Sequence, residues 1–129
     1  MFIEIDPGSS RPIFEQVVDQ IKFAIASKAV RPDEMIPSVR DLSKQLAINP
    51  NTIARAYRQL QDEGIVALRR GLGLAVVEGA AEKCRIQRKE FFQHKFQEFL
   101  DEAARSRLNR KELDEILLSG RPKTDQHES

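Results

Sequence analysis

The 129-residue chain has little of several residue types, and each scarcity excludes a class of protein. A single cysteine, Cys84, rules out a disulfide within the chain. The only histidines, His94 and His127, are not spaced with Cys84 as zinc ligands are, so no metal site is expected. No apolar run is long enough to span a membrane, and the first residues lack the basic start and apolar stretch of a signal peptide. These absences predict a cytoplasmic protein without cofactors.

The sequence also lacks the residue motifs of an enzyme active site. Ser38 has no neighbouring base to activate it, and no phosphate-binding loop of the Walker type occurs. Gly71-Leu72-Gly73 alone is too short a signal for a nucleotide site. Cys84 is expected to be a free thiol in a helix, with redox sensing as the less favoured alternative. The sequence therefore predicts a protein that is not an enzyme.

The net charge is only +1, but positive charge is concentrated in residues 38–73. That segment has a local excess of three positive charges. Its charged residues are Arg40, Lys44, Arg55, Arg58, Arg69 and Arg70 against Asp41, Asp62 and Glu63. Phosphate binding depends on where the cations lie and not on the total, so the segment is a candidate nucleic-acid surface. Ordinary solvated helix faces would give the same composition.

Residues 36–64 carry the strongest signal in the chain, two short amphipathic helices with a brief connection. Ser38 is a capping residue for the first helix, and Asn49 followed by Pro50 begins the second. Gly64 supplies the left-handed position that ends it. The helical spacing places four residues of the second helix inward: Ile53, Ala56, Tyr57 and Leu60. It leaves five polar residues outward: Asn51, Thr52, Arg55, Arg58 and Gln59. This is the helix-turn-helix plan, whose second helix enters the DNA major groove.

A small hairpin is expected directly afterwards. Residues 65–68 and 74–77 are strand-like, and Arg69, Arg70 and two glycines lie between them. Glycines allow a tight turn and a close approach of the backbone to another surface. Basic residues at such a tip suit a minor groove or phosphate, although charge for solubility is the alternative. We interpret the hairpin as the wing of a winged helix-turn-helix.

The remaining segments are expected to be mainly helical. Residues 2–5 alternate like a short edge strand, and a helix is predicted over 12–28. A long helix is predicted from Ala80 to near Leu108, and a short one follows to Gly120. The fold class is thus mainly α with a small β-hairpin wing. The expected domains are residues 1–78 for DNA binding, 79–120 for a two-helix tail and 121–129 for a disordered end.

The tail carries an apolar stripe that is expected to form a homodimer. Four of the seven phenylalanines lie within nine residues. The predicted dimerisation residues are Phe92, Phe96, Phe99, Ala103, Leu113, Ile116 and Leu117. A short appendage must bury such a stripe against something, and a second copy is the simplest partner. An effector pocket between the tail helices is the alternative, and both hold if a ligand enters at the dimer interface.

The order of these motifs resembles the GntR family of bacterial transcription regulators, and most of all its short-chain YtrA subfamily. The resemblance covers about two-thirds of the chain. It is carried by the stretches 12–16, 36–42, 49–57, 63–65 and 70–73. It implies a cytoplasmic repressor that binds a near-palindromic operator as a homodimer and responds to a small-molecule effector. The effector region would be the tail, because this subfamily has no large effector domain.

The resemblance also implies roles for single residues. Arg40 would reach into the major groove, where Asn49, Asn51 and Thr52 begin the recognition helix and Arg55 lies one turn on. Ser38 would bind phosphate, and Arg70 with Gly71 would form the wing tip. The chain departs from the family where glycines usually stand before and after the linker proline, because residues 28–33 read Lys-Ala-Val-Arg-Pro-Asp. It departs again in the wing, where Leu74 and Ala75 replace a hydroxyl residue and an aromatic one.

Two other functions remain as alternatives. A winged helix can bind protein and not DNA, but such a module would show an apolar patch where this one shows polar residues. RNA binding usually uses exposed aromatic side chains, whereas the one tyrosine, Tyr57, is predicted to lie inward.

Overall fold

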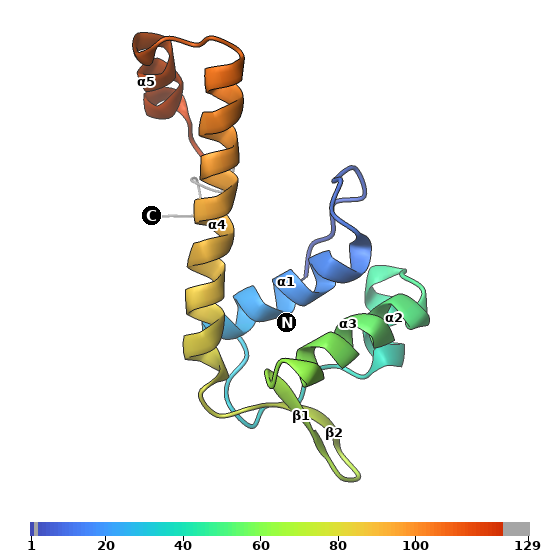
Figure 1. Ribbon diagram of the computed structural model, residues 1–129. Coiled ribbons are helices and arrows are strands. Elements are labelled where there is room, and N and C mark those ends of the chain that lie inside the picture. The colour runs from blue at the N-terminus through green and yellow to red at the C-terminus, as the bar shows by residue number, and fades with distance from the viewer. Residues whose placement is uncertain (2, 123–129) are drawn as a thin grey trace. The chain divides into compact units, whose positions relative to one another are not determined.

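The computed structural model describes residues 1 and 3–122 and confirms a mainly helical fold with one hairpin. The elements are α1 (Ile13–Ala26), α2 (Val39–Leu46), α3 (Pro50–Asp62), β1 (Val66–Arg69), β2 (Gly73–Val76), α4 (Ala80–Arg105) and α5 (Arg110–Ser119) (Figure 1). Two compact units divide the chain, the first running from Met1 to Glu90 and the second beginning at Phe91. Residues 121 and 122 are in no helix or strand, and the rest of the expected disordered end lies outside the described residues.

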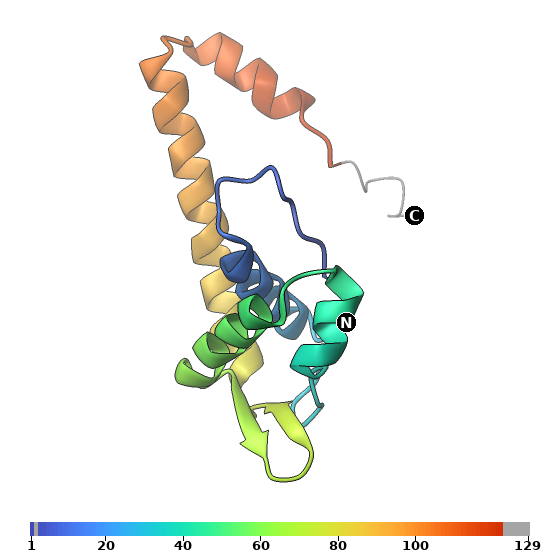
Figure 2. The ribbon, with the colours of Figure 1, turned by 90° about the vertical axis from the view of Figure 1, so that its right-hand side faces the viewer.

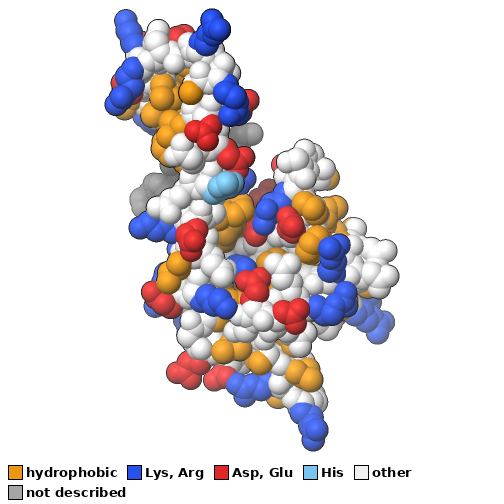
Figure 3. Space-filling view, viewed as in Figure 1, with side chains coloured by type: hydrophobic (Ala, Val, Ile, Leu, Met, Phe, Trp, Pro, Cys, Tyr) orange, Lys and Arg blue, Asp and Glu red, His pale blue; other side chains and the backbone are white. Residues whose placement is uncertain are grey.

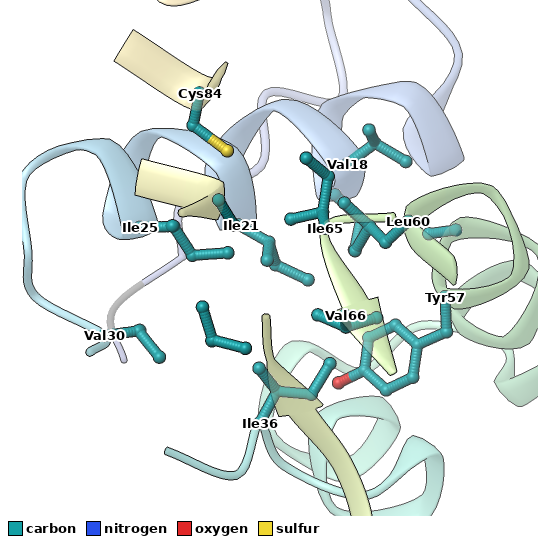
Figure 4. Close-up of a cluster of buried hydrophobic side chains, with 14 of the residues drawn as sticks. Val18, Ile21, Ile25, Val30, Ile36, Tyr57, Leu60, Ile65, Val66 and Cys84 are labelled. Carbon is teal, nitrogen blue, oxygen red and sulfur yellow. The ribbon is translucent and has the colours of Figure 1, made fainter. Parts of the chain in front are cut away.

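The core of the first unit forms where α1 crosses α3. The apolar stripe of α1 places Val17, Ile21 and Ile25 fully inside. The four residues of α3 that were predicted to lie inward are all buried, which confirms the helical phase. Ile65, Val66 and Val76 of the hairpin region belong to the same core, and Figure 4 shows Ile65 and Val66 among its buried side chains. The opposite face of α3 is left to solvent.

The helix starts follow from their capping residues. The Ser38 hydroxyl accepts the Asp41 amide hydrogen, and the Asn49 side chain accepts that of Asn51. Asn109 and Glu112 form a reciprocal capping box at the start of α5. Each bond satisfies a backbone N–H group that has no acceptor within the helix. Each cap therefore fixes where its helix begins.

The hairpin is antiparallel, with Val66 opposite Val76 and Arg69 opposite Gly73. The linker before α2 lies along its free side. Backbone bonds of 2.9 Å join Asp33 N–H to the Val76 carbonyl and Ile36 N–H to the Leu74 carbonyl. These bonds join the linker to β2 through an isolated bridge, and the sheet itself stays two-stranded. Figure 2 shows the hairpin turned by 90° from its view in Figure 1. The prediction of a strand at residues 2–5 is wrong for residues 3–5, which form no strand. Ile3 is nevertheless buried in the core.

The linker keeps the left-handed turns that glycine would favour, although it has no glycine there. Lys28 has φ 65° and Asp33 has φ 66°. Lys28 follows the end of α1, where the Ala29 N–H bonds back to the Ala24 carbonyl at 2.9 Å. A side chain in this region is strained by roughly 1–2 kcal/mol, because its Cβ approaches the following carbonyl oxygen. The hydrogen bonds of the linker hold the turns in spite of that cost.

Lys28→Gly is therefore expected to raise the free energy of unfolding by up to about 1 kcal/mol. The relief of strain exceeds the roughly 0.5–1 kcal/mol that glycine adds in chain entropy. Urea unfolding measures the change. The matched control is Ser27→Gly, because Ser27 has an ordinary φ of −84° and should only lose stability. A loss of stability in Lys28→Gly as well would show that the turn is not strained.

The first turns of α4 belong to the first unit. Ala80 and Cys84 are buried in its core, Cys84 completely. Beside them Lys22 of α1 binds the Glu63 carboxylate at 2.7 Å, and Gln59 donates to the same group. Burial alone would raise the pKa of Glu63, but the bonds from Lys22 and Gln59 outweigh it and the pKa is lowered. A charged, paired carboxylate thus ties α1 to the end of α3.

Candidate nucleic-acid interface

The two helices of the helix-turn-helix are joined by a short, well-bonded turn. Ala47 ends α2 with a left-handed φ of 54°, and the Ser43 hydroxyl donates to the Ile48 carbonyl. Asn49 then caps α3 with a 2.8 Å bond to the Asn51 amide. This cap uses the side-chain oxygen of Asn49, so that oxygen supports the helix start. The turn brings the first residues of α3 to the surface.

The solvent-facing start of α3 carries the residues that were predicted there. Asn51 and Arg55 are exposed, and Thr52 is half-buried. Arg40 is exposed in the first turn of α2, directly after the cap made by Ser38. All of them lie on the first unit. Amide, hydroxyl and guanidinium groups offer both the donors and the acceptors that base edges and phosphates require.

Arg55 has a partner that the sequence analysis missed. Its guanidinium carbon lies 3.7 Å from the ring centroid of Phe14, near the start of α1. A cation above an aromatic face is held by the ring's charge distribution, which fixes the guanidinium in place. A shallow hollow of about 470 Å³ lies at this contact, lined by Ile13, Phe14, Asn51, Thr52 and Arg55. The helical spacing of Phe14 does not indicate this contact.

The two arginines of the wing have different surroundings. Arg69 forms an ion pair with Asp33 of the linker, which neutralises its charge. Arg70 and Gly71 are exposed at the tip, where Gly71 has φ 78° and open space around it. Figure 3 shows basic side chains at the end of the wing, at the bottom of the view. Arg70 is thus the wing arginine placed to approach a ligand.

The wing also exposes two apolar side chains that the sequence analysis did not assign to the surface. Leu68 is 70% exposed and Leu72 is 75% exposed. Gly73, the first residue of β2, packs closely: a Cβ there would lie 3.2 Å from the Met35 side chain. Leu68 and Leu72 thus form an exposed apolar edge in the same hairpin as Arg70.

The described residues give little support for a metal site, a reactive cysteine or a membrane-spanning helix. No group of three histidine, cysteine or acidic side chains in residues 1 and 3–122 is arranged to hold a metal, and His127 lies outside that part. Burial raises the pKa of the Cys84 thiol, which disfavours its reactive thiolate form. Within the same residues, no helix combines the length and apolar character needed to cross a bilayer.

Comparison with known proteins gives a consistent result. Residues 13–76 match the family described as bacterial regulatory proteins, gntR family. The YtrA protein of Sulfolobus acidocaldarius, a GntR-family transcription factor of known structure, is 30% identical; the match covers 73% of this chain and 97% of that one, with a TM-score of 0.59. The chain belongs to the GntR family.

Two further relatives bear on how the family's fold is used. The transcriptional repressor YtrA of Bacillus subtilis is 42% identical over 78 residues, which is 60% of either protein. The chain thus spans less than two-thirds of that relative's length. The DNA-binding domain of AraR, solved in complex with operator ORX1, is 27% identical with a TM-score of 0.53, and the match covers 60% of this chain and 99% of that domain. These names describe regulators and not enzymes, as the sequence predicted for this chain.

Proposed function

We propose that the chain is a sequence-specific DNA-binding transcription regulator that acts as a homodimeric repressor of a bacterial operon. The observation that carries the proposal is the polar start of α3, which is exposed on the same unit as Arg40 and the wing. This is the arrangement by which a winged helix-turn-helix recognises a major groove. The operator-bound AraR domain, which shares the fold, supports the same use here.

The proposed contacts are those of the sequence analysis. Ser38, Arg40, Asn49, Asn51, Thr52, Arg55, Arg70 and Gly71 would contact DNA. Because Asn49 caps α3 and Arg55 stacks on Phe14, we expect these two to shape the helix start as much as to touch DNA. Arg40, Asn51 and Thr52 are then the main candidates for base recognition.

The homodimer is proposed from the surface of the second unit. Phe92 is 53% exposed and Phe96 is 49% exposed, although both side chains are apolar. Phe99, Ile116 and Leu117 are also exposed, whereas Leu113 is half-buried and Ala103 is buried beside the turn that leads to α5. None of the residues of α5 is buried within the chain. A two-fold interface would cover this apolar surface on both copies and suit a near-palindromic operator. We place the small-molecule effector in this same region.

Selection of binding sites from random DNA duplexes tests the function directly. The purified chain should enrich a near-palindromic sequence, and it should bind that sequence far more tightly than a scrambled duplex at equal salt. No enrichment, together with equally weak binding to all duplexes, would contradict the proposal.

Arg70→Ala should weaken binding to every sequence and should make the negative slope of log affinity against log salt less steep by about 1.8, because each copy of the homodimer loses one phosphate contact. Titrations of operator and scrambled duplex at several salt concentrations measure both effects. Arg70→Lys should restore the slope, because it retains the charge. Arg105→Ala, a matched loss of charge on α4, should leave the slope unchanged. An unaltered slope in Arg70→Ala would remove the wing from the interface.

A further inference from the structure

The hydroxyl of Tyr57 joins parts of the interface that lie far apart in the sequence. Tyr57 comes from the inward face of α3 and is only 3% exposed. Its hydroxyl donates a hydrogen bond of 2.7 Å to the carbonyl oxygen of Pro37, twenty residues earlier. Figure 4 shows the ring inside the core, with its oxygen directed toward the segment that carries Ile36. Burial, and then the charge of Asp41, raise the pKa of Tyr57, so the hydroxyl keeps its proton.

The segment that receives this bond lies between three elements of the proposed interface. On one side, the Ile36 N–H bonds to the Leu74 carbonyl of β2 at 2.9 Å, which attaches the segment to the wing. On the other side, Ser38 caps α2, and Arg40 lies in the first turn of that helix. Tyr57 therefore fixes to α3 a segment that is bonded to the wing on one side and leads into α2 on the other.

The fold has other means of holding α3. Ile53 and Leu60, on the same face as Tyr57, are completely buried against the rest of the core. A phenyl ring at position 57 would fill nearly the same space, and Pro37 is only half-buried, so water can reach its surroundings. Removal of the hydroxyl should thus leave the fold intact while loosening the start of α2 relative to α3.

We propose that Tyr57 is a positioning residue, whose hydroxyl sets the place of Arg40 relative to the recognition helix and thereby sets DNA sequence discrimination. The proposal rests on the proposed DNA-binding function but adds a residue that touches no DNA. Base recognition by a side chain requires its helix to be placed accurately, whereas attraction to phosphate tolerates small displacements. Discrimination between sequences should thus suffer more than affinity for DNA in general.

Tyr57→Phe tests the proposal with two measurements. The first is affinity for the selected operator and for a scrambled duplex. We expect the ratio of the two affinities to fall roughly tenfold, the effect of losing about one net hydrogen bond, while scrambled-duplex affinity changes less than about twofold. The second needs no DNA: amide hydrogen exchange should quicken at Asp41 and Leu42, whose N–H groups bond to Ser38 in the first turn of α2.

Ile25→Val is the matched control. Ile25 is completely buried in α1, and its shortening should cost a similar small amount of stability without touching the bond to Pro37. It should leave both the affinity ratio and the exchange of the α2 amides as in the unmodified chain. An effect of Tyr57→Phe that Ile25→Val reproduces would overturn the proposal, because general loss of stability would then explain it.

The two measurements also separate this proposal from the one on which it rests. An unmodified chain that shows no preference for any duplex would contradict the DNA-binding function, and the exchange experiment would still decide whether Tyr57 positions α2. Unchanged exchange and an unchanged affinity ratio in Tyr57→Phe would overturn the positioning role alone. A Tyr57→Phe chain that does not fold would overturn it as well, because the bond would then serve the fold itself.

Discussion

Phe96→Asp is expected to convert a homodimer into a monomer and to lower operator affinity by about a hundredfold or more, because two linked half-site contacts become one. Phe96 is 49% exposed, and its ring stacks on that of Phe99 with centroids 6.4 Å apart. A carboxylate at the centre of this apolar pair would have to be buried without a partner in any dimer that covers it. Sedimentation and operator titration measure the two effects.

The matched control adds the same charge elsewhere on α4. His94 is two residues away, on the opposite side of the helix, since each residue turns an α-helix by about 100°. His94→Asp replaces an exposed pair with Glu98 by a weak repulsion at the helix surface, worth only about 0.2–0.5 kcal/mol, so it should leave the dimer and the affinity unchanged. If Phe96→Asp sediments as a dimer, the tail is not the dimerisation element, and the phenylalanines need another explanation.

Shortening the chain gives an independent test, and the structure decides where to cut. A chain of residues 1–79 would lose Ala80 and Cys84 from the core of the first unit. A chain of residues 1–90 keeps them and matches the compact unit from Met1 to Glu90. The longer form should stay folded, sediment as a monomer and show the same weakened operator binding as Phe96→Asp.

The sequence predicted the parts of the fold that depend on local rules. Ser38 and Asn49 mark helix starts because their side chains bond to amides only two or three residues on, within reach of a local pattern. The burial of Ile53 and Leu60 followed from helical spacing in the same way. Gly64, with φ 73°, ends the region of α3 as predicted.

The contacts that refine the candidate site join distant residues, which explains why the sequence did not reveal them. Arg69 pairs with Asp33 across 36 positions, and Tyr57 bonds to Pro37 across twenty. The position of Phe14 under Arg55 depends on how α1 crosses α3, which no helical spacing specifies. The left-handed turns at Lys28 and Asp33 were likewise hidden, because glycine is the usual signal for them and is missing here.

Arg40→Ala is expected to weaken binding to the selected operator by about 1–3 kcal/mol and to relax the preference at one or two base pairs, if Arg40 bonds to a guanine edge. The expectation rests on the position of Arg40, which is exposed in the first turn of α2, just after the Ser38 cap. Arg40 is also close in sequence to Pro37, whose carbonyl accepts the hydrogen bond from Tyr57. A selection from random duplexes, repeated with the variant, should show which base pairs lose their preference.

Two matched variants separate base recognition from simple attraction to phosphate. Arg40→Lys keeps the charge but not the planar pair of donors, so it should retain affinity for scrambled DNA while losing discrimination. Lys44→Ala removes a charge from the last turn of the same helix and should weaken operator and scrambled duplex alike. If Arg40→Ala instead loses equal affinity for both duplexes, Arg40 is a phosphate contact, and base recognition rests with Asn51 and Thr52 at the start of α3.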